Sequence, residues 1–119
     1  MTTHFGAGAG QATEDAYILG RLLAHPAINS GNVTKALQVY DAIRRPIANA
    51  VVDWSLKLGL LYEFVEEYLP PGTDAAKLHA GDRDELKKIG KEMDKIWTFH
   101  SNSSPQDDWK RAEEMLQTV

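Results

Sequence analysis

Apolar residues recur at helical spacing in five segments of this chain, whereas no segment shows a convincing strand pattern. The first three helices are expected at about residues 11–24, 33–45 and 46–68. The fourth helix is expected to begin at residue 82 and the fifth at residue 105. The pattern therefore predicts an all-α fold with about five helices.

Several of these boundaries carry residues that cap or break helices. Asn32 is expected to cap the second helix, and Pro46 either kinks that helix or opens the third. Asp82 followed by Glu85 is a capping-box pattern at the start of the fourth helix. Ser104 precedes a proline, which is typical of an N-cap followed by the first helical residue.

The first helix differs from the others because it is apolar almost all round. Its segment AYILGRLLA, residues 16–24, has Arg21 as its only charge. A helix with this pattern is buried on several sides. The other helices of a 119-residue chain are too few to cover its whole circumference, so we expect something beyond this chain to pack there.

Composition excludes several classes of function. The net charge is −4 at pH 7, so a nucleic acid or an anionic membrane is not an expected partner. The chain has no cysteine, which excludes disulfides and thiolate chemistry. No apolar run is long enough to span a bilayer, and the N-terminus lacks a signal-peptide pattern, so we expect a cytoplasmic protein without a membrane partner.

A glycine-rich stretch, HFGAGAGQ, immediately precedes the first predicted helix. The segment Gly6, Ala7, Gly8, Ala9 and Gly10 lacks the third glycine of the dinucleotide fingerprint and the Gly-Lys-Ser/Thr of a P-loop. On its own it is equally typical of a loop that approaches an anionic ligand and of a tight turn with a glycine-rich cap. The glycines therefore leave both interpretations open.

The wider string around these glycines resembles a segment of FAD-dependent aromatic-ring monooxygenases of the salicylate hydroxylase group. That family has a segment Pro-His-x-Gly-x-Gly-x-x-x-Ala-x-Glu-Asp-Ala, which is matched here by His4, Gly6, Gly8, Ala12, Glu14, Asp15 and Ala16. Residues 36–64 are similar to the family's Ala-Leu-x-x-Tyr-x-x-x-Arg-x-Pro-Arg-Ala-Asn segment, and KIWTFHSNSSPQDDWKRAEEML is similar to the C-terminal tail of fungal members. The resemblance covers nearly the whole chain.

The chain departs from the family in what it lacks. It has neither the Rossmann-type half nor the substrate-binding sheet, and the Gly-Asp motif that normally comes just upstream is absent. Thr3 stands at the family's proline, and Ile47 stands at an arginine. The resemblance therefore implies the C-terminal helical part of an α/β FAD-dependent monooxygenase fold, and we expect this part to be inactive by itself.

The resemblance also implies a role for the glycine segment. Backbone N–H groups from Gly6 to Gly10, at the positive end of the following helix, would bind the pyrimidine edge of FAD. His4 is either a solvated loop histidine, which we favour, or a neighbour of the flavin. The complete enzyme would hydroxylate a small aromatic substrate with NAD(P)H and O₂. Its missing N-terminal FAD-binding part would be the partner of this chain, in cis or in trans. The alternative is a free-standing helical module that binds a partner without redox activity.

On this interpretation residues 1–119 form a single helical unit of a larger protein. Residues 1–68 hold the flavin-proximal segment and the buried helices, and residues 69–119 form charge-rich C-terminal surface helices. No residue of the chain is expected to be catalytic or to bind a metal, because no nucleophile elbow is present and the histidines have no partners at ligand spacing.

Two further expectations concern packing. Glu14 and Asp15, in the first turns of a helix, are expected to complement its dipole and to pair with Arg44 or Arg45. The three tryptophans, at positions 54, 97 and 109, are expected to anchor the core.

Overall fold

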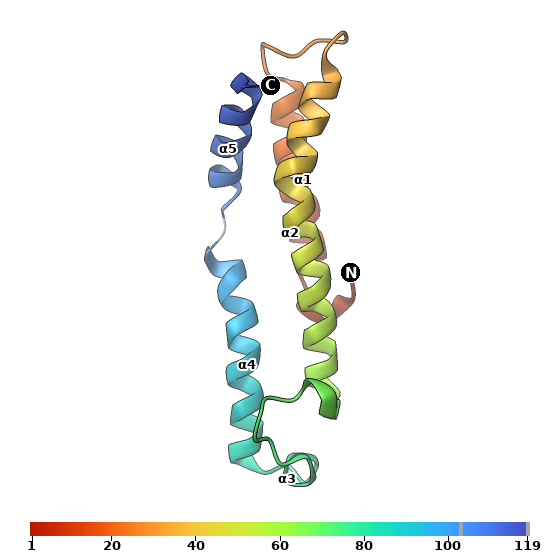
Figure 1. The fold of residues 1–119 in the computed structure, drawn as a ribbon, viewed down its shortest axis with the longest axis vertical. Coiled ribbons are helices and arrows are strands. Elements are labelled where there is room, and N and C mark those ends of the chain that lie inside the picture. The colour runs from red at the N-terminus through yellow and green to blue at the C-terminus, as the bar shows by residue number, and fades with distance from the viewer. Residues whose placement is uncertain (103, 119) are drawn as a thin grey trace. The chain divides into compact units, whose positions relative to one another are not determined.

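The helical elements of the protein are seen in a computed structural model, which describes residues 1–102 and 104–118 and omits the side chains of residues 99–102. The short elements are two 3₁₀ turns, η1 (Thr3–Phe5) and η2 (Glu66–Tyr68). The α-helices are α1 (Gly8–Leu23), α2 (Val33–Tyr62), α3 (Ala75–His79), α4 (Arg83–Asn102) and α5 (Pro105–Thr118) (Figure 1). The described residues form no strand, so the predicted all-α fold is confirmed.

The second and third predicted helices are one helix, α2, with Pro46 inside it. A proline inside a helix removes one backbone hydrogen bond at a cost of about 3 kcal/mol. Val39 and Ile43, before Pro46, and Val51, after it, are all buried. These residues share one face only if the helix continues through Pro46, so their burial offsets the cost of the proline. The prediction that Pro46 opens a new helix is wrong.

The end of α2 also differs from the prediction, since the helix stops at Tyr62 rather than near Tyr68. Phe64 has a φ of 53°, in the left-handed region that usually takes glycine after a helix. The N–H of Val65 then donates to the carbonyl oxygen of Leu60 at 3.0 Å, which closes the helix end. The short helix α3 was not predicted, because five residues are too few to show a periodic pattern.

Two of the three predicted caps form as expected. Asp82 Oδ1 accepts hydrogen bonds from the N–H groups of Asp84 and Glu85, each at 3.0 Å. Glu85 does not complete the capping box, because its carboxylate accepts from the N–H of Asp74 instead. Ser104 Oγ accepts from the N–H of Asp107 at 3.2 Å.

Asn32 precedes α2, but its side chain is directed to the loop before the helix. Its Oδ1 accepts from the N–H of Asn29 at 2.7 Å, and its Nδ2 donates to the carbonyl oxygen of Ala27 at 2.9 Å. The prediction that this side chain caps α2 is therefore wrong, because the preceding loop uses both of its polar atoms.

The chain forms two compact units. Unit 1 comprises Met1–Phe5 with Val52–Asn102, and unit 2 comprises Gly6–Val51 with Ser103–Val119. The boundary between them lies within α2, so the units differ from the division at residues 68 and 69. That earlier division concerned the complete enzyme and stays a prediction.

The core of unit 2 is built where α1, the first part of α2 and α5 pack together, with α5 beside α1 (Figure 1). Its buried residues are Ile18, Leu22, Ala36, Val39, Ile43, Trp109, Ala112 and Leu116. Trp109 is 8% exposed, which confirms it as a core residue.

Helix α1 is buried on one face only. Gln11, Ile18 and Leu22 are its buried residues, whereas Leu23 is 44% exposed. The exposed face carries small uncharged residues, namely Ala9, Ala12, Thr13, Ala16 and Gly20. The apolar pattern of α1 predicts burial on several sides, but the described residues of this chain bury only one face of the helix.

Unit 1 surrounds the ring of Phe5, which is fully buried. The Phe5 ring centroid lies 4.7 Å from that of Trp97 and 6.3 Å from that of Trp54. Trp54 is half-buried and Trp97 is 38% exposed, so the prediction of a core position is wrong for Trp97. Its ring covers Phe5 with one part and remains in contact with water through the rest.

Candidate functional site

The glycine segment is a turn followed by the first turn of a helix, rather than a loop that precedes the helix. Gly6 has a φ of 61°, a left-handed conformation that glycine adopts without strain. Ala7 is buried and holds the N-cap position, and Gly8, Ala9 and Gly10 are helical and exposed. The expected loop is therefore limited to residues before Gly8.

The first turn of α1 presents backbone N–H groups. The N–H of Gln11 donates to the carbonyl oxygen of Ala7 at 2.8 Å, so the N–H groups of Gly8, Ala9 and Gly10 precede the first bond of the helix. Ala7 has no side chain that could cap them. These groups and the helix dipole together make the start of α1 suitable for a negatively charged ligand group.

The space around this turn is open. A Cβ atom added at Gly8 or Gly10 would meet no heavy atom of the chain within 4 Å. Glycine lowers the stability of a helix relative to alanine, and no packing contact within the described part of the chain requires it at these two positions. The glycines therefore leave the backbone of this turn accessible to a partner outside the chain.

Side chains in the first two turns of α1 are held by Arg44 of α2, which is 2% exposed. Arg44 Nε donates to Asp15 Oδ1 at 2.7 Å, and Nη2 donates to Gln11 Oε1 at 2.8 Å. Nη1 donates both to Glu14 Oε2 at 3.2 Å and to Asp108 Oδ2 on α5 at 2.9 Å. One guanidinium thus joins three helices; we call these five residues the Arg44 cluster.

Three carboxylates surround the one guanidinium of the cluster. Burial alone would lower the pKa of Arg44, but hydrogen bonds and charges from Asp15, Asp108 and Glu14 outweigh it and raise that pKa. Burial, together with the negative charge of Asp15, also raises the pKa of the neighbouring Tyr40 hydroxyl. The arginine is therefore permanently charged in the folded chain.

The predicted pairing of Glu14 and Asp15 with Arg44 is confirmed. Arg45, the alternative partner, is exposed and pairs with Asp41 at 2.9 Å. Sequence reasoning missed Gln11 and Asp108. Gln11 follows the glycines three residues before Glu14, a helical spacing that could have placed it with the acidic pair.

His4 lies in unit 1, beside Thr2, Gly59 and Tyr62. Its Nδ1 lies 3.2 Å from Thr2 Oγ1, and its ring centroid lies 6.3 Å from that of Tyr62. A Cβ atom added at Gly59 would come within 2.7 Å of His4 Nδ1, so the missing side chain of Gly59 makes room for the imidazole. Thr2, His4 and Gly59 belong to the lining of a cavity of about 200 Å³. A position of His4 beside the flavin, the less favoured of the two interpretations, stays a prediction.

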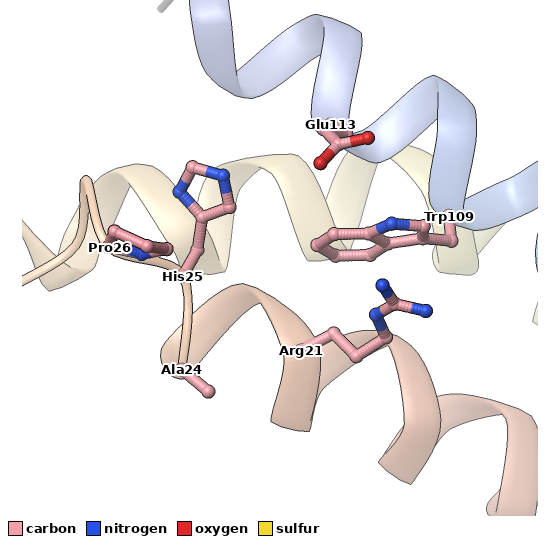
Figure 2. A pocket seen from close by; sticks show the side chains of 6 residues that line it. All are labelled: Arg21, Ala24, His25, Pro26, Trp109 and Glu113. Atoms are coloured by element: carbon pink, nitrogen blue, oxygen red, sulfur yellow. The ribbon is translucent and has the colours of Figure 1, made fainter.

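A second cavity, of about 450 Å³, lies in unit 2 where α1 ends (Figure 2). It is lined by Arg21, Ala24, His25, Pro26, Trp109 and Glu113. The Arg21 guanidinium lies 4.3 Å from the centre of the Trp109 ring, and its Nη1 donates to the Tyr17 hydroxyl at 2.6 Å. Figure 2 shows Arg21 stacked on one face of the indole, where it covers the edge of the apolar core.

Among the side chains of residues 1–98 and 104–118, no three histidines, aspartates or glutamates are grouped so as to hold a metal ion. None of the helices in residues 1–102 and 104–118 combines the length and the apolar character that crossing a bilayer requires.

Comparison with known proteins relates this chain to flavin enzymes. A salicylate hydroxylase of Pseudomonas putida is 49% identical over 63 residues, which are 53% of this chain and 14% of that protein. An FAD-dependent monooxygenase of Strobilurus tenacellus is 30% identical over 106 residues, or 87% of this chain and 20% of that protein. Another FAD-dependent monooxygenase, from Aspergillus terreus, is 40% identical over 99 residues, which are 79% of this chain and 21% of that protein.

The chain is thus similar in sequence to FAD-dependent monooxygenases, and the resemblance seen in its motifs is confirmed. It spans only about a fifth or less of the length of these curated relatives, between 14% and 21%. No family model and no solved structure matches the chain.

Proposed function

We propose that this chain is the C-terminal helical part of an FAD-dependent monooxygenase, in which the first turn of α1 binds the pyrimidine edge of the flavin. The observation that carries the proposal is the turn Gly8–Gly10. Its N–H groups precede the first helical bond, and its glycines are in open space that the chain itself does not fill. Relatives named as FAD-dependent monooxygenases support the choice of flavin as the ligand.

The residues present fit such a ligand. A flavin gains negative charge at its pyrimidine end on reduction, and N–H groups at a helix N-terminus stabilise an anion there. Glycine at positions 8 and 10 lets the ring approach the backbone, because any side chain would stand between them. The bound FAD would supply the redox chemistry, with NAD(P)H and O₂, for hydroxylation of a small aromatic substrate.

The exposed face of α1 fits the same proposal. A helix face of alanine, threonine and glycine without charge is unusual in contact with water, and small residues allow close packing. The N-terminal FAD-binding part of the enzyme, in cis or in trans, would cover this face. The chain alone would lack most of the flavin site and the whole substrate site, and would therefore be inactive.

The proposal is tested by replacing the matched segment of the Strobilurus tenacellus monooxygenase with this chain and comparing Gly8→Val with the unchanged chimera. A Cβ atom at residue 8 meets no atom of the chain within 4 Å, so we expect the effect of valine to come from the ligand. We expect weaker FAD retention and a lower flavin reduction potential, since one lost interaction of this kind is worth on the order of 1–3 kcal/mol.

Gly90→Val is the matched control. Gly90 also lies in a helix, α4, and a Cβ atom there meets nothing within 4 Å. We expect this variant to keep the FAD stoichiometry and potential of the chimera. Equal flavin binding by the Gly8→Val variant would contradict the proposal and would leave the turn as a structural cap. The alternative, a partner-binding module without redox activity, gains no support from the relatives.

A further inference from the structure

We infer that Arg44 is a positioning residue, which holds the glycine turn of α1 in helical geometry through side chains of the first two turns of that helix. Three of its hydrogen bonds reach Gln11, Glu14 and Asp15, in the first two turns of α1. A fourth reaches Asp108 of α5 and anchors the guanidinium to a second helix.

The turn needs such support because its own residues favour the helix weakly. Glycine is among the poorest helix formers, and it occupies two of the first three positions of α1. Ala7 at the N-cap cannot accept a hydrogen bond with its side chain, so the stabilisation usual at this position is missing. Without further contacts, the first turn of α1 would fray.

The guanidinium supplies contacts at the right positions. Gln11, Glu14 and Asp15 are spaced by three and four residues, so they share one face of α1, and each bonds to a different nitrogen of Arg44. The planar fork fixes these three side chains relative to one another, which a lysine ammonium cannot do in the same way. Because Arg44 is 2% exposed, water competes little for these bonds.

The other end of the cluster is equally well held. Asp108 is 4% exposed and also accepts a hydrogen bond from Arg111 of α5. The position of Arg44 is therefore set by α2 and α5, and the first turns of α1 follow it. The effect of Arg44 on FAD binding rests on the proposed function, whereas its effect on the first turn of α1 does not.

Hydrogen exchange followed by NMR on the 119-residue chain tests the positioning. In Arg44→Lys we expect the amides of Gln11, Ala12 and Thr13 to exchange about tenfold faster relative to core amides such as that of Leu116, because only the start of α1 is loosened. Arg45→Lys is the matched control, since Arg45 is exposed and bonds only to Asp41 among the ion pairs found. Its exchange pattern should match that of the wild type.

A second variant covers the case in which Arg44→Lys fails to fold. Gln11→Met removes one bond to Arg44 but keeps side-chain length and helix propensity, so the same local acceleration should appear in a folded chain. Uniform acceleration of all amides, or none at the start of α1, would overturn the inference, because a merely structural cluster affects the core and the turn alike.

Flavin measurements on the chimera separate this inference from the proposed function. With both correct, Arg44→Lys weakens FAD retention and lowers the reduction potential, while Arg45→Lys changes neither. Local acceleration of exchange without any flavin effect would overturn the proposed contact with FAD and leave the positioning role intact. Hydrogen exchange at the wild-type rate at the start of α1 would overturn the positioning role, irrespective of FAD retention and reduction potential.

Discussion

Two glycines four residues apart should respond in opposite ways to the same substitution. Gly6 has a φ of 61°, in the left-handed region, and Gly10 lies in the first turn of α1. An added Cβ atom meets nothing within 4 Å at either position. Any difference between Gly6→Ala and Gly10→Ala therefore comes from backbone conformation and not from a clash.

The magnitudes follow from that conformation. Alanine in the left-handed region costs about 1–2 kcal/mol, so we expect Gly6→Ala to lower the free energy of unfolding by about 1 kcal/mol. Alanine in a helix is better than glycine by about 0.5–1 kcal/mol, so Gly10→Ala should raise it by that amount. For a chain of this size, 1 kcal/mol corresponds to a shift in Tm of roughly 4 °C.

Urea and thermal unfolding followed by circular dichroism at helix wavelengths measure both variants. Gly20→Ala is the control, because Gly20 lies in the same helix, also in open space, and should be stabilised like Gly10. If Gly6→Ala is as stable as the wild type, or if Gly10→Ala is less stable, the assigned conformation of the turn is wrong. A stabilised Gly10→Ala chain would also show that glycine here is kept for a reason other than stability.

Three further predictions concern other parts of the chain. Gly59→Ala should destabilise unit 1 in the presence of His4 but not in a His4→Ala background, as measured in a double-mutant cycle by urea unfolding, because the three atoms nearest to the added Cβ atom all belong to the imidazole. Hydrogen bonds from Lys57 and Lys95 lower the pKa of Glu92, so its contribution to stability is present at neutral pH and is lost as the pH falls through that lowered pKa; Glu92→Gln should flatten the acid side of the stability curve. Trp109→Ala should cost about 3–5 kcal/mol in the free energy of unfolding, since it opens the core of unit 2, and an undiminished midpoint in urea would contradict that packing.

The sequence alone determined the features that depend on neighbouring residues. Helical periodicity predicted all-α structure, and two N-caps were found at Asp82 and Ser104 because such caps act within three residues. The motifs around Glu14 and Asp15 were sufficient to identify the resemblance to flavin monooxygenases. The same acidic pair, with two arginines one helix away, predicted an ion pair that the structure confirms for Arg44.

Only the tertiary structure decided the features that depend on distant residues. Pro46 remains inside α2, and Gly8–Gly10 are helical, because packing and hydrogen bonds from elsewhere outweigh their weak local preference for a helix. Asp108 joins Arg44 from 64 positions away in the sequence, a pairing that no local pattern contains. The exposed face of α1 likewise appeared only in three dimensions, because burial depends on which helices the chain can bring to that face and not on the periodicity of the helix itself.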